Sequence, residues 1–448
     1  MRIDDILNDA ISLFSKHHKV IVICAGILYR ILLDLLYIFA VNPMFDYFGS
    51  VFVLSEIKYV LSWILYLTIF ILLPKEENSV ISVFLNFQFI FTIAPLLVFY
   101  GLANQSTKYI LMVSVCIILQ IIILRKARKI LVNPPYINRV GPYVMIASGL
   151  LILLTVTAIF LYNGFAGTGA MDLAFIYDIR RASRLPVVFT YLSELCTKAM
   201  IPFFFLYFLY HKKYLAAIIL FCVQMLLYLL LGHKFILFIL PLLFCFFVLA
   251  KFGILVKFSY ILFGLCSLGS LMTYLLSAPF SSTHYFKLPT SLFAHRMLFV
   301  PAMIKFQFYD VFSELPFMFF GDGQIGRLFS IPSMYPESVG RTIWAFYREG
   351  DFSVNANTGY LADSYAQMGF AGMIIISILV ALTILAIHNL SNSNPKFIIG
   401  ASIVLLYTII FNDGAFFTIF LTSGLWFAII LLMIFLRDID HSDKVTKG

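Results

Sequence analysis

The chain has 448 residues, of which 62% are hydrophobic and only 12% charged, and its formal net charge is +9. Soluble domains contain about half apolar and about a quarter charged residues, so this composition excludes a soluble enzyme and predicts an integral membrane protein. The basic residues are scattered among short connectors, which gives no indication of nucleic-acid binding, and the six cysteines lack the spacing of a zinc site or a disulfide framework.

Apolar segments of membrane length follow one another along almost the whole chain. A helix needs about 20 mainly apolar residues to cross a bilayer, and twelve segments approach this length. They cover residues 20–40, 57–73, 79–100, 108–124, 143–162, 190–210, 214–231, 235–250, 258–277, 366–388, 397–412 and 415–436. We therefore predict an all-α, polytopic membrane protein in which residues 1–448 form a single transmembrane domain.

Basic residues in the connectors predict which side of the membrane each connector occupies, because cytoplasmic loops are enriched in Lys and Arg. Arg125, Lys126, Arg128 and Lys129 follow the fourth segment, and alternate connectors before and after it are also basic. With twelve crossings, both termini are expected in the cytoplasm. Residues 163–189 and 278–365 then form two large loops on the opposite, non-cytoplasmic side.

Two charged residues lie inside the first apolar segment. Arg30 and Asp34 are four residues apart, so they share a helix face and are expected to neutralise each other. Arg30 is expected to be the one cation deep within a span. Four amides are expected to form hydrogen bonds between helices: Asn86, Gln88, Gln120 and Gln224.

The first of these loops, residues 163–189, carries arginines that the orientation rule disfavours on the non-cytoplasmic side. Arg180, Arg181 and Arg184 lie within five residues, and on a helix Arg180 and Arg184 would share one face. Guanidinium groups bind phosphate oxygens bidentately, so the cluster predicts a site for a pyrophosphate. The alternative is that these arginines pair with neighbouring acids or with lipid phosphates.

The second of these loops, residues 278–365, interleaves aromatic residues with charges around Arg296, a pattern that favours an amphipathic helix on the membrane surface over a plain solvated loop. Further on, Asn357 is expected to cap a helix that carries Asp363 in its first turns. An acid there also stabilises the positive end of a helix, which gives Asp363 a purely structural alternative. For Arg296, the structural alternative is pairing with Asp310 or Glu314.

Several motifs of soluble and membrane enzymes are missing. Residues 41–56, the first predicted outer loop, contain Asp46 and Glu56 but no closely spaced acids of the kind that hold a metal in lipid-linked glycosyltransferases. The chain also lacks a Gly-rich nucleotide-binding loop, a Walker-type lysine and zinc-ligand spacing. We therefore expect no metal and no cofactor, and a substrate that is carried on a lipid.

Five short segments resemble sequence motifs of one protein family. They are residues 180–182 (Arg-Arg-Ala), 232–234 (Gly-His-Lys), 296–301 (Arg-Met-Leu-Phe-Val-Pro), 309–313 with Pro316, and 355–365 (Asn-Ala-Asn-Thr-Gly-Tyr-Leu-Ala-Asp-Ser-Tyr) with Gly369 and Gly372. Together they resemble bacterial O-antigen polymerases of the Wzy type. The likeness in layout, with a long late loop, extends over the whole chain.

The resemblance implies an enzyme of the bacterial inner membrane with a metal-independent glycosyltransferase fold, related to that of O-antigen ligases. Such an enzyme acts at the periplasmic face on oligosaccharide repeat units carried by undecaprenyl pyrophosphate. It transfers the growing chain from its lipid carrier to a hydroxyl of the next lipid-linked unit. Its other expected partners are membrane lipid and a chain-length regulator protein.

The resemblance also implies roles for individual residues. The expected catalytic residues are Arg296, Asp363, His295 and Glu349. Arg296 would stabilise the departing pyrophosphate, and the general base would be Asp363, Glu349, Asp351 or His295. The expected substrate-binding residues are Arg180, Arg181, Arg184, Lys234, Arg341, Asn355, Asn357 and Tyr365.

Two other functions stay open. An O-antigen ligase would use a similar donor but transfer the polymer to lipid A-core, and the Asn-x-Asn-Thr-Gly sequence of residues 355–359 is the reason to prefer a polymerase. A lipid-linked oligosaccharide flippase, which is not an enzyme, would carry several cations inside the bundle to escort the pyrophosphate. The sequence suggests only Arg30 in such a position.

Overall fold

The computed structural model describes residues 18–127, 140–164, 185–277, 284–348, 350–391 and 396–445, and within these ranges every regular element is a helix. The longer elements are α2 (His18–Leu36), α4 (Glu56–Leu72), α5 (Val80–Gln88), α6 (Ala94–Leu102), α7 (Thr107–Ala127), α8 (Gly141–Asn163), α10 (Val187–Leu195), α11 (Ile201–Tyr210), α12 (Tyr214–Leu231), α13 (Lys234–Lys251), α14 (Leu255–Ser277), α15 (Val300–Glu314), α17 (Val339–Tyr347), α18 (Tyr360–Leu390), α19 (Lys396–Asp413) and α20 (Leu425–Val445). Short α-helical turns are α3 (Asn42–Phe45) and α16 (Gln324–Phe329). The π-helical segments η1 (Tyr37–Val41), η3 (Phe89–Ile93), η5 (Cys196–Met200), η7 (Thr290–Phe299) and η8 (Thr418–Thr422), and the 3-10 turns η2 (Asp46–Phe48) and η6 (His284–Lys287), complete the described elements.

Ten helical segments of the described ranges are long and apolar enough to cross a membrane. They are Lys19–Phe48, Val80–Leu102, Thr107–Ala127, Gly141–Asn163, Val187–Tyr210, Tyr214–Leu231, Lys234–Lys251, Leu255–Ser277, Tyr360–Leu390 and Lys396–Asp413. The chain is thus a multi-pass, all-helical membrane protein, as its composition predicts. The other two predicted segments correspond to α4, which has 17 residues, and to α20, whose apolar part is Leu425–Leu436, so the total of twelve crossings stays a prediction.

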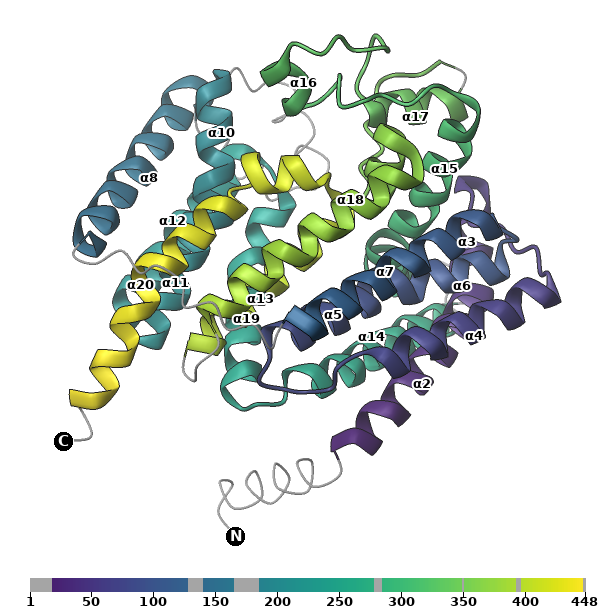
Figure 1. The fold of residues 1–448 in the computed structure, drawn as a ribbon, viewed down its shortest axis with the longest axis horizontal. Helices are drawn as coiled ribbons and strands as arrows, with labels where there is room; N and C mark the ends of the chain where they lie inside the picture. Colours follow the sequence, from purple (N-terminus) through teal and green to yellow (C-terminus); the bar gives the residue numbers. More distant parts are fainter. Residues whose placement is uncertain are drawn as a thin grey trace.

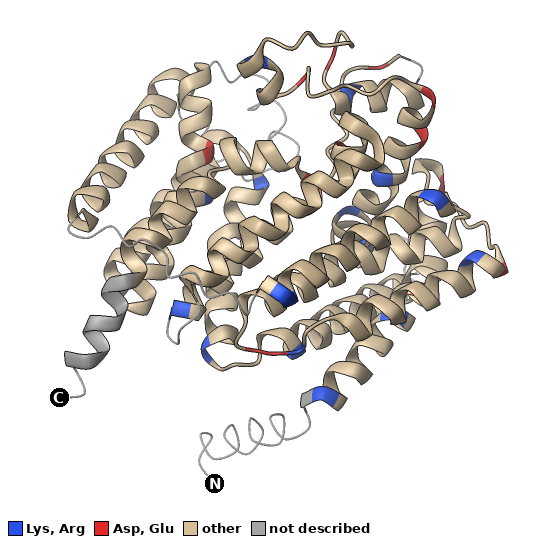
Figure 2. Ribbon diagram, viewed as in Figure 1, with Lys and Arg blue, Asp and Glu red and all other residues tan. Residues whose placement is uncertain are grey.

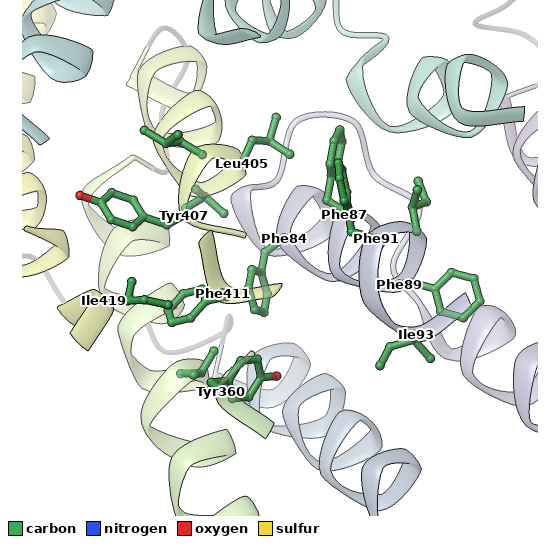
Figure 3. Packing of buried hydrophobic residues seen from close by; sticks show 14 of the residues in the cluster. Phe84, Phe87, Phe89, Phe91, Ile93, Tyr360, Leu405, Tyr407, Phe411 and Ile419 are labelled. Carbon is green, nitrogen blue, oxygen red and sulfur yellow. The ribbon is translucent and has the colours of Figure 1, made fainter. Parts of the chain in front are cut away.

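The centre of the bundle is the continuous helical segment α5–η3–α6. All its residues are buried, as expected for a helix that is apolar on every side. Around it, α2 packs on α14, α4 on α6, α19 on α5 and α13, and α18 on α7, which Figure 1 shows as a layered set of inclined helices. Phenylalanines fill the interior, and Figure 3 shows Phe411 of α19 beside Tyr360 at the start of α18, with 5.7 Å between ring centroids.

The four predicted amides do form hydrogen bonds between helices. Asn86 accepts from a tyrosine hydroxyl of α14 at 2.9 Å, and Gln224 donates to backbone carbonyls of η5 and α13 at 3.2 Å each. Gln88 and Gln120, from α5 and α7, both donate to the hydroxyl of Tyr360. The start of α18 is therefore fixed to the centre of the bundle by two side chains from neighbouring helices.

The predicted ion pair inside the first span is also present. Arg30 and Asp34 are 3.3 Å apart and both are buried, and the Arg30 guanidinium lies 5.1 Å from the centre of the Trp63 ring. The expectation that Arg30 is the one cation deep within a span is wrong. Lys198 lies in the middle of the span formed by α10, η5 and α11, where it pairs with Glu194 one turn before it.

Residues 284–359, here called the cap segment, fold onto one end of the bundle, here called the loop end. Figure 2 shows that charged residues gather in the cap and at the helix ends, whereas the helices between are nearly free of them. The predicted surface helix around Arg296 is instead a continuous η7–α15 unit that packs against α14, α18, α6 and η1. Its aromatic residues are mostly buried because the bundle, and not the lipid surface, covers them. The exposed flank includes Arg296.

Lys305 fastens the cap to the bundle. Its ammonium group donates to the carbonyl of Pro301 at 3.1 Å and to the carbonyl and side-chain oxygens of Asn412 at 3.0 and 3.1 Å. Asn412 ends α19, where unpaired carbonyls carry the negative end of the helix dipole, so a cation is favourable there. Burial lowers the pKa of Lys305 to about 8, against the opposite effect of the Asp413 charge.

The longest helix, α18, is broken near its loop end. Met368 (φ −148°, ψ 22°) and Gly369 (φ 61°, ψ −148°) leave the helical conformation, which separates residues 360–367 from residues 370–390. The conformation of Gly369 is one that residues with a side chain rarely adopt. A Cβ atom there would also lie 2.8 Å from the ring of Phe317. Glycine is therefore required at this break for two independent reasons.

We expect Gly369→Ala to destabilise the protein by about 3 kcal/mol, because it combines an unfavourable backbone conformation with overpacking. The matched control is Gly149→Ala, whose added Cβ meets nothing within 4 Å in the interior of α8; this change should stabilise the helix by about 0.5–1 kcal/mol. Thermal unfolding of the detergent-purified variants measures both. Equal melting temperatures for the two variants would show that the break does not require glycine.

Candidate functional site

The break in α18 leaves carbonyl groups that the helix cannot satisfy itself. In an unbroken helix each carbonyl accepts from the N–H four residues later. Here the carbonyls of Ala366 and Gln367 accept instead from the backbone N–H groups of Met318 and Phe319, at 3.0 Å each. Broken helices in membrane proteins are tolerated where the freed groups are satisfied by protein, and they are typical of substrate sites. The junction of α18 with the cap is thus a candidate site.

The cap residues at these donors are strained. Phe319 and Phe320 both have left-handed backbones, with φ of 46° and 64°, a conformation that costs roughly 1–2 kcal/mol per residue with a side chain. The N–H of Phe320 is held by the side-chain oxygen of Gln367 at 2.7 Å. Strain of this kind persists only where the surroundings enforce it, and it is concentrated at functional sites.

Two carboxyl groups meet at the broken end. Asp363 lies in the first turn of α18, one turn before Gln367. The Gln367 amide donates to Asp322 of the cap at 3.2 Å and also hydrogen-bonds Asp363, on which the charge of Asp322 acts. The other oxygen of Asp322 accepts from the N–H of Val339 at the start of α17. Asp322 and Asp363 both keep partial exposure and both are hydrogen-bonded by Gln367, so the two carboxyl groups share one donor at the broken end.

The Asn-x-Asn-Thr-Gly sequence leads into this site, but not as a helix cap. Asn357 was expected to cap α18, whereas the capping position is Gly359 and no side chain caps the helix. The oxygen of Asn357 accepts instead from Asn355 at 2.6 Å. Gly359 lies against the end of α19, where a Cβ would be 2.5 Å from the carbonyl of Asn412. The helix therefore begins beside the end of α19, and Asn357 lies before its first turn.

Tyr365, expected to bind substrate, is buried beside the same junction. Its hydroxyl lies 3.3 Å from that of Ser313, and its ring packs 5.1 Å from Tyr309 and 5.9 Å from Phe317. These contacts make Tyr365 part of the wall that joins α15 to α18. It supports the site without facing solvent.

A second cluster, here called the aromatic–arginine cluster, consists of Phe45, Phe48, His295, Trp344 and Arg348. The imidazole of His295 stacks on Phe45 (3.6 Å between centroids, 4° between planes) and meets the edge of Phe48. Phe48 and Trp344 lie 6.4 Å apart. The guanidinium of Arg348 lies 5.9 Å from the centre of the Phe48 ring and 5.4 Å from the centre of the Trp344 ring. Three separate chain segments thus meet at the loop end of the first span. One is α3 with η2, the second is η7, and the third is α17 with Arg348.

His295 is neutral in this setting. Burial, and then the charge of Arg296, lower its pKa to about 4, so at neutral pH the imidazole is not a cation. It is 8% exposed, and its Nε2 atom has no hydrogen-bond partner among the described residues. Arg296, the next residue, is exposed on the flank of η7. The pair therefore presents an exposed guanidinium beside a neutral, ring-stacked histidine.

Other predicted site residues are dispersed or lie elsewhere. Arg341, on the exposed face of α17, pairs with Glu337 at 2.9 Å, and Lys234 begins α13. Asp351 is exposed and accepts from Trp344 at 2.9 Å and from Ser353. These hydrogen bonds lower its pKa, which makes it a poor base. Four predicted residues lie outside the described ranges: Arg180, Arg181, Arg184 and Glu349.

Six residues of the two clusters were not singled out in the sequence as site residues: Asp322, Gln367, Phe45, Phe48, Trp344 and Arg348. A signal for Gln367 was present, because Gly369 interrupts the start of a long apolar run and an isolated glycine there marks a break. No comparable signal exists for Phe48 and Trp344, which are far apart in the chain. Their approach depends on how the cap folds back on the first span.

Comparison of the chain with protein-family models, with curated proteins and with solved structures gave no match. A strained junction with two partly exposed carboxyl groups, together with a cluster of rings and an arginine at the same end of a membrane bundle, is suited to a substrate that is partly lipid and partly polar.

Proposed function

We propose that this protein polymerises lipid-linked oligosaccharide repeat units at the periplasmic face of the bacterial inner membrane. The observation that carries the proposal is the broken end of α18, where Asp363 is held at the loop end of a membrane bundle next to strained cap residues. The resemblance of residues 355–365 to O-antigen polymerases involves this same stretch. A soluble sugar or nucleotide would not require such a site to lie at a membrane boundary.

The proposed reaction is a glycosyl transfer. The acceptor is a hydroxyl of the incoming lipid-linked repeat unit, and the donor is the growing chain on undecaprenyl pyrophosphate. The acceptor oxygen forms a bond to the anomeric carbon of the chain while the bond from that carbon to the pyrophosphate oxygen breaks. The hydroxyl proton passes to the carboxylate of Asp363, acting as general base. Undecaprenyl pyrophosphate leaves with the bonding electron pair.

Arg296 is the described residue proposed to stabilise the leaving pyrophosphate. Negative charge grows on the pyrophosphate as the bond breaks, and a preorganised guanidinium lowers that barrier. The alternative role, pairing with Asp310 or Glu314, does not fit the fold. These residues follow Arg296 on the continuous η7–α15 helix, so the nearer of them is about 20 Å away along the axis.

The topology that accompanies this proposal has twelve crossings, with α4 and α20 counted as spans, and both termini in the cytoplasm. Lys75, Lys212, Lys213 and Lys251 then lie on the cytoplasmic side, together with Arg125, in agreement with the enrichment of basic residues there. The cap segment and its two clusters lie in the periplasm.

The two alternatives differ in what they require. A flippase needs cations along a path through the bundle, but Arg30 and Lys198, the cations described deep within spans, are each paired with an acid one turn away. No observation on the described residues favours it. A ligase would use the same chemistry with a different acceptor, so only an experiment on the product separates it from a polymerase.

We expect deletion of the gene to reduce the long polysaccharide ladder on a lipopolysaccharide gel to core carrying a single repeat unit. Loss of a ligase would instead leave bare core, with polymer accumulating on the lipid carrier. Loss of a flippase would leave bare core without such polymer. Bare core in the deletion strain, or an unchanged ladder, would contradict the polymerase proposal. Restoration of the ladder by a plasmid copy is the control.

A further inference from the structure

We propose that the aromatic–arginine cluster binds a sugar ring of the saccharide chain, at a distance from the reacting end. This inference rests on the proposed function and adds a second, saccharide-binding subsite to it. The ligand class is a pyranose ring with an apolar C–H face and neighbouring hydroxyl groups. Phe48 and Trp344 supply aromatic surface, Arg348 supplies N–H donors over these two rings, and Asp351 supplies a carboxylate at the edge of the indole ring.

The geometry of Arg348 suits hydroxyl recognition. Its guanidinium is placed over two rings, 5.9 Å from Phe48 and 5.4 Å from Trp344, and the side chain remains exposed. A guanidinium held against rings keeps its five N–H donors in a fixed plane. Neighbouring hydroxyls of a sugar are acceptors at a spacing that such a fork can reach. A lipid tail would gain nothing from these donors.

Asp351 orients the indole ring. One carboxylate oxygen accepts from the indole N–H of Trp344 at 2.9 Å and from the hydroxyl of Ser353 at 2.9 Å, while the other accepts from the Ser353 N–H at 2.8 Å. These hydrogen bonds lower the pKa of Asp351, so it is a carboxylate at neutral pH. A free phosphate would be repelled by this charge, whereas a sugar hydroxyl can donate to it.

The position of the cluster relates it to the broken end of α18. Phe48 ends the first span, so the cluster lies at the membrane boundary, where lipid-linked sugars are presented. Helix α17 has nine residues. It begins at Val339, whose N–H is bonded to Asp322, and ends at Tyr347, the residue before Arg348. This corresponds to about 12 Å of helix. A saccharide chain can extend over such a length, and a single sugar cannot.

Intrinsic fluorescence tests the subsite directly. The chain has three tryptophans, so Trp63→Phe with Trp426→Phe leaves Trp344 as the one emitter. Two probes are titrated into the detergent-purified protein: lipid-linked repeat units extracted from the deletion strain, and the same saccharide released from its lipid by mild acid. We expect a saturable change in Trp344 emission with both probes, because the subsite recognises sugar. Arg348→Ala should weaken the apparent affinity about tenfold, the size of one aromatic or cation contact.

Phe346→Ala is the matched control, since Phe346 is an exposed ring of α17 outside the cluster, and it should leave the affinity unchanged. A response to the lipid-linked probe alone would assign binding to the lipid and overturn the sugar subsite. Absence of any change in Trp344 emission with either probe would also overturn the sugar subsite. If deletion shortens the ladder while Trp344→Ala and Arg348→Ala keep it at wild-type length with unchanged binding, the subsite fails and the proposed function stands. If deletion leaves the ladder intact but Trp344 responds to both probes, the polymerase proposal fails and the sugar site stands.

Discussion

Asp363→Asn is expected to reduce polymerisation by roughly 10²–10⁴-fold, the range over which a positioned general base contributes to catalysis. The amide has the same shape and can still hydrogen-bond Gln367, so the junction with the cap should stay folded. What it loses is the ability to accept the proton of the acceptor hydroxyl. The measurement is the rate at which purified protein in liposomes lengthens lipid-linked repeat units, together with the gel ladder in cells.

The structural alternative for Asp363 has a matched control. Glu56 is also an acid in the first turn of a helix at a span end, on α4, and it is exposed. If Asp363 only complements the helix dipole, Asp363→Asn and Glu56→Gln should both cost about 0.3–1 kcal/mol of stability and leave the rate unchanged. We expect a small loss of stability with an unchanged rate for Glu56→Gln, but not for Asp363→Asn. A normal ladder from well-expressed Asp363→Asn would remove Asp363 from the catalytic step.

Arg296→Ala is expected to reduce polymerisation by about 10²–10³-fold, as measured for single preorganised donors that stabilise developing negative charge. Because Arg296 is exposed on the flank of η7, its removal should not disturb the buried face that holds the helix. Expression and melting temperature should therefore be close to those of the wild type. Arg296→Lys should recover part of the activity, since a lysine supplies the charge but not the two-pronged donor geometry.

Arg327→Ala serves as the control for loss of an exposed cation, because Arg327 is exposed in the last turn of α16 and has no role in the proposed reaction. It should keep a normal ladder in cells and a normal rate in liposomes. A wild-type ladder from Arg296→Ala would exclude an essential role for this residue. Full rescue by lysine would instead keep the role and exclude the need for a bidentate donor.

Features that depend on neighbours in the chain could be predicted from the sequence. The pairing of Arg30 with Asp34 follows from their four-residue spacing, and it is present. The amides in apolar segments had to find partners within the bundle because lipid offers none, and Gln120 does so with Tyr360. The prediction of a multi-pass helical protein needed no more than the lengths of the apolar segments.

Features that depend on distant segments could not be predicted. The aromatic-rich helix after Arg296 has the pattern of a surface helix, yet α18 and α6 cover it. Lys305 has the pattern of a solvated cation, yet it is 1% exposed because the carbonyl end of α19 needs a donor there. Asn357 fits the sequence of a helix cap, but α18 begins only after Gly359, whose backbone lies against the end of α19.

The hydrogen bonds that join the cap to the break in α18 also have a consequence for the order of folding. The carbonyls of Ala366 and Gln367 are completed by N–H groups from residues 318 and 319, a contact between positions far apart in the chain. Such non-local contacts form late, because the intervening loop must first be closed at an entropic cost. The inner part of α18 can form while the chain enters the membrane, but its loop end cannot be complete until the cap has folded over it. The junction around Asp363 is therefore complete only in the finished molecule, so a partly folded chain in the membrane would lack the candidate site.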